Sequence, residues 1–169
     1  FYIFFELALI PMAFLIGIWG EEDRTSATYG FVIYTLVGSL LMLVGVLTVG
    51  FTSATLIEGI SFSTHFDDLM AAAPLFQELP FWVFGSFLFA FAIKIPLFPF
   101  HSWQANAYAQ APIPAVLFMA PIMVKFGSYA IVRFVIPYFP VLFEAVTPWI
   151  ATLSVLSILY GAMIAITTT

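Results

Sequence analysis

Three ionisable residues lie deep inside apolar stretches of the sequence: Glu6, Lys94 and Lys125. The chain has thirteen charged residues, four Lys or Arg and nine Asp or Glu, and the other ten lie between the apolar stretches or near their ends. At a rise of about 1.5 Å per residue, each of the three lies roughly 18–21 Å from one end of its stretch. This shared depth predicts that three helices each place one ionisable group near the middle of a bilayer.

Such groups are costly, so their presence needs an explanation. Each costs roughly 2.5–3.5 kcal/mol on insertion scales unless it pairs with another charge or meets water. Burial and a neighbouring like charge both disfavour the charged form of a lysine, whereas a nearby carboxylate favours it. Movement of Glu6 relative to Lys94 would therefore switch the protonation of the lysine, which predicts a proton or cation path. The alternative is a structural Glu–Lys pair that locks helices together, although one acid cannot neutralise two bases.

Composition identifies the class of protein. Of the 169 residues, 63% are apolar and 8% are charged, against about 45–50% and 25% in ordinary globular proteins. We therefore predict an all-α, polytopic transmembrane bundle in a lipid bilayer, and we exclude a nucleic-acid-binding protein. The absence of cysteine excludes disulfides, Cys-ligated zinc, iron–sulfur ligation and thiol catalysis, and we expect no cofactor and no metal in this chain.

Apolar runs long enough to cross a hydrocarbon core of about 30 Å predict five spans in a single membrane domain, residues 1–169. The predicted spans are 1–19, 29–51, 80–104, 113–136 and 141–166. The chain begins without Met inside an apolar run, and we expect it to be an internal piece of a longer membrane subunit. In the connection 52–79, we expect a short surface helix that starts at Asp67 and ends before Pro74.

Prolines predict interruptions close to the charged residues. Pro96 and Pro99 each remove a helical hydrogen bond, so we expect the third span to break near 95–100. Discontinuous helices at membrane depth are tolerated where protein or a water-filled cavity satisfies their backbone. Pro11 and Pro121 should each free a carbonyl one turn back, near Glu6 and Lys125 respectively. An ordinary kink is the alternative at both positions.

Histidine and tryptophan supply the remaining candidates. His101 follows the predicted break, where its imidazole could carry protons or serve as a structural hydrogen-bonding group. Trp19, Trp103 and Trp149 are near predicted helix ends, and we interpret them as anchors at the membrane interface.

Three segments resemble the antiporter-like membrane subunits of respiratory complex I. The glutamate-bearing helix is similar to residues 4–20 (FFELALIPMAFLIGIWG), and the lysine-bearing broken helix with its following loop is similar to residues 92–112 (AIKIPLFPFHSWQANAYAQAP). The next lysine-bearing helix resembles residues 124–140 (VKFGSYAIVRFVIPYFP). The order Glu, Lys-x-Pro, His-x-Trp, Ala-Pro, Lys-x-Gly-x-Tyr is specific to this superfamily, and Lys125 followed by Arg133 favours its M-type branch.

The resemblance implies a fold and a function for the chain. It implies part of an inverted-repeat, antiporter-like bundle, in which Glu6 and Lys94 form the charge pair, Lys125 is the onward relay and His101 a further relay candidate. It also implies proton translocation coupled to quinone reduction elsewhere in the complex, other membrane subunits as partners, and a bacterial plasma membrane or inner organelle membrane as the location. Residues 104–108 read Gln-Ala-Asn-Ala-Tyr and lack the acid and second histidine usual in the family.

Two rival functions stay open at this point. A multisubunit cation/proton antiporter or a membrane-bound hydrogenase shares the same motifs. A structural membrane scaffold would hold the same charges in static pairs.

Overall fold

The computed structural model describes residues 1–55 and 62–167 and consists of helices throughout that part of the chain. A portion of the predicted connection 52–79 lies outside the described residues. The helices, in chain order, are α1 (Tyr2–Leu7), α2 (Leu9–Trp19), α3 (Arg24–Ala54), α4 (Phe66–Phe76), α5 (Phe81–Lys94), α6 (Ser102–Gln110), α7 (Ile113–Phe118), η1 (Met119–Met123), α8 (Val124–Ala130), η2 (Ile131–Val135), α9 (Ile136–Tyr138) and α10 (Pro140–Thr167). The all-α class predicted from the sequence is confirmed.

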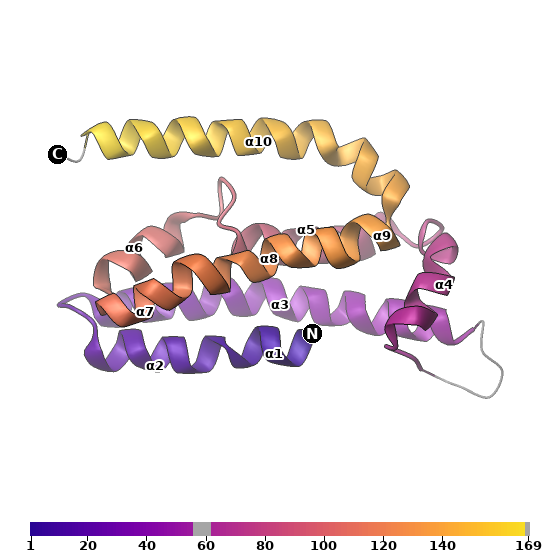
Figure 1. Ribbon diagram of the computed structural model, residues 1–169, viewed down its shortest axis with the longest axis horizontal. Coiled ribbons are helices and arrows are strands. Elements are labelled where there is room, and N and C mark those ends of the chain that lie inside the picture. The colour runs from indigo at the N-terminus through magenta and orange to yellow at the C-terminus, as the bar shows by residue number, and fades with distance from the viewer. Residues whose placement is uncertain (56–61, 168–169) are drawn as a thin grey trace.

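The long helix α3 is the centre of the bundle, and α2, α4, α5 and α6 all pack against it (Figure 1). Two glycines allow α5 to approach α3 closely. A methyl group at Gly38 would lie 3.2 Å from the Cα atom of Ala90, and one at Gly45 would lie 3.0 Å from the ring of Phe87. Small residues at such crossings let backbones come together where lipid provides no hydrophobic drive for association.

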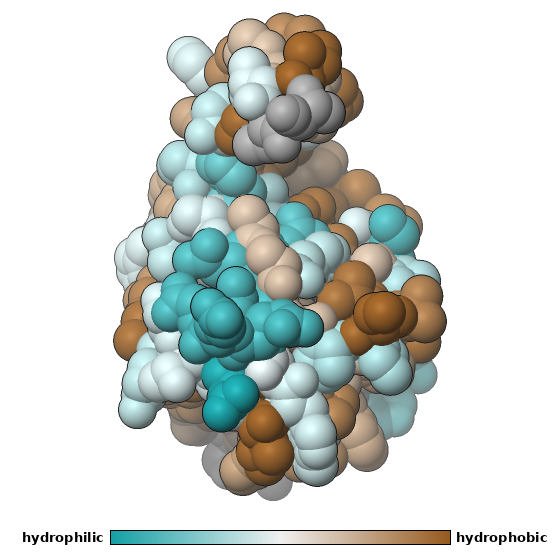
Figure 2. All heavy atoms as spheres, turned by 90° about the vertical axis from the view of Figure 1, so that its left-hand side faces the viewer, coloured by the Kyte–Doolittle hydropathy of each residue, from teal (hydrophilic) through white to brown (hydrophobic). Residues whose placement is uncertain are grey.

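Several helical stretches of the described chain are long and apolar enough to cross a membrane. Four continuous or nearly continuous stretches meet that criterion among the described residues: Tyr2–Trp19, Arg24–Ala54, Ile113–Tyr138 and Pro140–Thr167. The apolar helix α5 is shorter, because the broken span is divided between α5 and α6. Figure 2 shows hydrophilic residues gathered on the end of the bundle where α2 turns into α3. This polar end beside apolar helix faces fits a multi-pass integral membrane protein.

The last helix, α10, runs alongside the bundle and is joined to it through α9 (Figure 1). None of its residues is buried in the described chain. Three partly buried apolar residues in its first turns, Leu142, Phe143 and Val146, pack against the core of the bundle. Further along the helix, the Ser157 hydroxyl accepts a hydrogen bond from the Phe98 N–H (2.9 Å), and the Tyr160 ring lies 5.0 Å from that of His101. The helix therefore touches the bundle at its own first turns and at the broken span.

Proline distorts several of the helices, in three different ways. At Pro11, the missing N–H leaves the Leu7 carbonyl without its helical donor, and the first span is interrupted between α1 and α2. Pro121 lies inside the π-helix η1, whose wider turn accommodates the lost bond. The prediction that Pro74 ends the surface helix is wrong: α4 continues through Pro74 to Phe76, because proline keeps a helical φ and removes only one hydrogen bond.

Candidate functional site

Lys94 is the last residue of α5 and is almost fully enclosed by protein, with 1% of its surface exposed. Its ammonium nitrogen lies 4.6 Å from the centre of the Phe5 ring, in a cation–π arrangement. The C-terminal end of a helix carries partial negative charge, which favours a cation there. The Lys94 Nζ atom has no hydrogen-bond partner among the described residues. The break in the span thus creates a buried site for a cation that protein only partly satisfies.

Glu6 lies on α1, directly after Phe5, whose ring contacts the ammonium of Lys94. It is two residues before the interruption at Ala8. Its carboxylate interacts electrostatically with Lys94 and lies beside the side chain of Ser39 on α3. The Oε1 atom of Glu6 is buried without a hydrogen-bond partner among the described residues. The two charges predicted to work together are therefore neighbours in the structure.

Glu6 and Lys94 are nevertheless not in direct contact. Within residues 1–55 and 62–167, no carboxylate oxygen of Glu6 lies within 4.0 Å of the Lys94 nitrogen, and the ion pair found there joins exposed His65 to Asp67 at 3.9 Å. A closed ion pair would fix both protonation states and hold the helices together. The two groups instead lie on two interrupted helices without a closed ion pair between them.

The break itself spans residues 95–101 and is held by hydrogen bonds that replace the helical ones. The N–H of Ile95 still bonds to the Phe91 carbonyl (2.8 Å), but the N–H of Leu97 bonds to Ala92 instead of Ile93 (2.9 Å). The Ile93 carbonyl accepts a hydrogen bond from the indole Nε1–H of Trp103, at 3.0 Å. A shifted backbone pair and a side chain thus satisfy two of the released carbonyls, those of Ala92 and Ile93.

This geometry overturns the sequence-based interpretation of Trp103. Trp103 is not an interface anchor, because it is 3% exposed and its ring lies 5.5 Å from that of Phe31 in the interior. A helix end at a break inside the bundle looks the same in the sequence as one at the membrane surface. Trp19 and Trp149 are exposed, at 63% and 73%, as interface anchors would be.

His101 is partly buried and is the last residue of the break, directly before α6. Its ring is stacked on Phe98, 5.5 Å between centroids, and meets the ring of Tyr160 on α10 edge-on. Its Nδ1 atom is buried without a hydrogen-bond partner among the described residues. Through His101 the broken span meets α10.

Lys125 lies apart from the other candidates. It is in the first turn of α8, and its side chain is exposed in the described chain. The face of α8 that packs on α5 presents Gly127, where an added methyl group would lie 3.3 Å from Cβ of Lys94. Within the described residues, the Lys125 side chain therefore does not share the buried site of Glu6 and Lys94. Its role as a relay stays a prediction.

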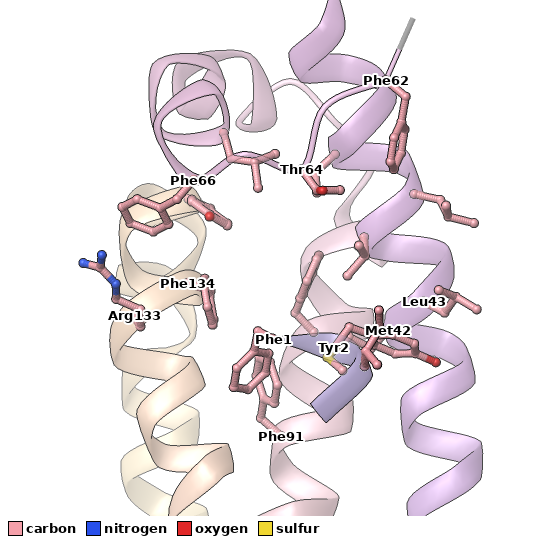
Figure 3. A pocket seen from close by; sticks show the side chains of 17 residues that line it. Phe1, Tyr2, Met42, Leu43, Phe62, Thr64, Phe66, Phe91, Arg133 and Phe134 are labelled. Carbon is pink, nitrogen blue, oxygen red and sulfur yellow. The ribbon is translucent and has the colours of Figure 1, made fainter. Parts of the chain in front are cut away.

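A cavity of about 580 Å³ lies against the side of α5 that bears Phe87 and Phe91, and it is apolar in character. Phe1, Tyr2 and Met42 lie at its base, and the guanidinium group of Arg133 points away from it (Figure 3). That group lies 3.9 Å from the centre of the Phe66 ring instead. Because neither Glu6 nor Lys94 lines this cavity, it is not part of the ionisable site.

Sequence reasoning missed three residues at the site: Ser39, Trp103 and Ser157. Each reaches the site across a helix interface, and no local pattern specifies such a contact. The only signal for Trp103 was its place in the His-x-Trp motif directly after the double proline. The described residues contain no group of three or more His, Cys, Asp or Glu side chains that could hold a metal ion.

Comparison with known proteins places the chain in a family. The family of NADH:quinone oxidoreductase and Mrp antiporter transmembrane proteins matches residues 1–169. The chain is 40% identical to NADH-ubiquinone oxidoreductase chain 4 of Chondrus crispus over 164 residues, covering 96% of this chain and 32% of the relative. It is 36% identical to NADH-quinone oxidoreductase subunit M of Rhodobacter capsulatus over 178 residues, covering 98% and 33%.

A solved structure gives the same result. A chain of respiratory complex I from Thermus thermophilus with bound NADH matches with a TM-score of 0.79 and 40% identity, over 98% of this chain and 34% of that one. This chain therefore spans about a third of the length of the relatives that it matches. From its sequence and its fold, the chain belongs to the family of NADH:quinone oxidoreductase and Mrp antiporter transmembrane subunits.

Proposed function

We propose that the chain is a proton-translocating part of an NADH:quinone oxidoreductase, driven by quinone reduction elsewhere in the complex. The relatives are subunits M and chain 4 of such enzymes, which supports the assignment of the complex and of other membrane subunits as partners. In this proposal the chain holds no redox cofactor of its own, and its contribution is a path for protons through the bilayer.

The observation that carries the proposal is the state of Lys94. A buried ammonium without a hydrogen-bond partner among the described residues, facing a carboxylate that it does not contact, is costly to maintain. A purely structural role would favour a closed pair or an apolar residue at this position. Lys94 between two interrupted helices instead has the geometry of a group that gains and loses a proton as Glu6 moves.

The remaining relay steps are proposed from their positions. Protons on Lys94 pass onward to Lys125, and the exposed face that bears Lys125 is completed by the parts of the subunit that this chain does not include. His101, with a buried Nδ1 that has no hydrogen-bond partner among the described residues and that lies at the contact with α10, is a second carrier at the end of the break.

The test is proton translocation by the intact complex in membrane vesicles. In Lys94→Met, we expect quinone-dependent electron transfer to lose its coupled proton uptake, while NADH oxidation by an artificial acceptor stays normal. Glu144→Gln, which removes an exposed charge on α10, is the control and should behave as wild type. A wild-type ratio of protons to electrons in Lys94→Met would contradict the proposal.

A cation/proton antiporter subunit is the second candidate, because the family description includes Mrp antiporters. The two candidates differ in whether ion transport requires electron transfer. Vesicles containing the antiporter would exchange sodium for protons without NADH, whereas the proposed pump requires electron transfer. Sodium-dependent proton release that survives without NADH would favour the antiporter.

A further inference from the structure

One side chain connects the two halves of the broken span. Trp103 lies in the first turn of α6, and its indole N–H reaches back across the break to the carbonyl of Ile93, at 3.0 Å. Ile93 is the residue immediately before Lys94, so this carbonyl and the backbone N–H of Lys94 belong to the same peptide group. Ile93 is itself 2% exposed, and its Cδ1 atom packs against α3 at Gly38.

The Ile93 carbonyl depends on this bond. In a continuous helix it would accept the N–H of Leu97, but that N–H is given to Ala92 at 2.9 Å. A buried carbonyl that is left without a donor is destabilising, so the indole replaces the helical donor that the break removes. The bond forms only when α6 holds its present position relative to the last turn of α5.

We propose that Trp103 is a positioning residue for Lys94: its indole N–H fixes the last peptide of α5 and so holds the lysine ammonium at its working distance from Glu6. This inference rests on the proposed function of Lys94. With the Ile93 side chain held by α3 and the Ile93 carbonyl held by α6, the backbone at Lys94 is fixed from two directions. Loss of the N–H would let this peptide rotate and would change the approach of the ammonium to the carboxylate.

The competing explanation is packing alone, because the indole ring also contacts Phe31. Two tryptophan analogues separate the two explanations. Benzothienylalanine at position 103 keeps the size and shape of the bicyclic ring but has sulfur in place of N–H. Fluorotryptophan keeps both the ring and the N–H, and it serves as the matched control for the incorporation method.

The experiment is steady-state kinetics of the intact complex carrying either analogue at position 103, alongside Trp103→Phe. We expect fluorotryptophan to match wild type. Benzothienylalanine should lower the kcat for proton-coupled quinone reduction by a factor of about two to ten, the range expected for one lost hydrogen bond. The KM for quinone should not change, and turnover is normalised to NADH oxidation by an artificial acceptor, which counts assembled complex.

Each outcome has a defined meaning. Wild-type kcat with benzothienylalanine would overturn the inference, as would an equal loss with both analogues, because either result would assign the role to the ring. A fall in the amount of assembled complex with unchanged kcat would also overturn it, since a merely structural residue acts in that way. Lys94→Met, measured beside them, separates the proposals: if it pumps normally the proposed function fails, and if it alone is inactive only the role of Trp103 fails.

Discussion

Gly127 brings α8 close to the end of α5, and Gly127→Ala tests whether that approach sets the geometry around Lys94. A methyl group there would lie 2.7 Å from Cγ1 of Ile95 and 3.2 Å from the backbone oxygen of Phe91. The Ile95 side chain can rotate away, but the Phe91 oxygen cannot, because it accepts the N–H of Ile95 at 2.8 Å. The added methyl group therefore presses on the last helical hydrogen bond of the lysine-bearing helix.

The expected destabilisation by Gly127→Ala follows from comparison with a glycine whose surroundings have room for a methyl group. Replacing a helical glycine by alanine gains about 0.5–1 kcal/mol from backbone entropy, and this gain is common to Gly127→Ala and Gly85→Ala. Gly85 is also within an apolar helix, and a methyl group there would meet nothing within 4 Å. The difference between the two variants therefore isolates the overpacking cost, about 1–3 kcal/mol.

The assay is amide hydrogen exchange in the intact complex, read on peptides that include the Ile95 N–H. A cost of about 1–3 kcal/mol in local opening corresponds to exchange roughly 5- to 150-fold faster. We expect this acceleration in Gly127→Ala and not in Gly85→Ala. Equal exchange at Ile95 in the two variants would refute the reasoning, because it would mean that α8 does not constrain the end of α5.

Three further predictions concern individual side chains. Glu6→Gln should reduce proton translocation more than Glu6→Asp, since a negative charge beside the lysine is required; equal activities in vesicles would argue against that requirement. Lys125→Met should keep normal assembly and thermal stability but depress turnover, and Lys125→Arg should be nearly as inactive because arginine does not readily release a proton; full proton transport in the arginine variant would favour a fixed charge. Ser157→Ala should cost about 1–3 kcal/mol in thermal unfolding because it leaves the Phe98 N–H without its acceptor, whereas Ser154→Ala, which loses only a bond within its own helix, should cost less.

Much of the fold followed from the sequence for clear physical reasons. Only helices satisfy their backbone in lipid when no barrel is formed, so the apolar composition fixed the class. Two closely spaced prolines removed enough hydrogen bonds to break a span, and the break falls between Lys94 and Ser102. Depth alone placed Glu6, Lys94 and Lys125 at a similar level, where charges on packed helices lower their cost by approaching one another, and the resemblance to the family indicated Glu6 and Lys94 as the pair.

The direction of Lys125 was harder to predict, and the π-helices explain why. The sequence places a lysine at a given depth, but the face on which it lies depends on the angle accumulated along the helix, about 100° per residue. A π-turn takes in roughly one extra residue and rotates everything that follows by about that angle. The π-helix η1 ends at Met123, two residues before Lys125. The direction of the Lys125 side chain therefore depends on how Pro121 is accommodated in η1, and the periodicity of the sequence could not predict it.

The residues that hold the site in place are harder to identify from the sequence than the charged residues themselves. A charged residue in an apolar span stands out in the sequence because its insertion into lipid is unfavourable in every orientation. A tryptophan or serine that bonds to a freed backbone group does not stand out, because its insertion into a membrane helix has a small free-energy cost in any orientation. Trp103 and Ser157 each satisfy one group released by the break, a carbonyl and an N–H respectively, and they come from two different helices, α6 and α10. A movement of either helix would therefore act on the peptide groups around Lys94 without touching its side chain. Under the proposed function, such a movement of α10 would change the protonation of Lys94 through the backbone.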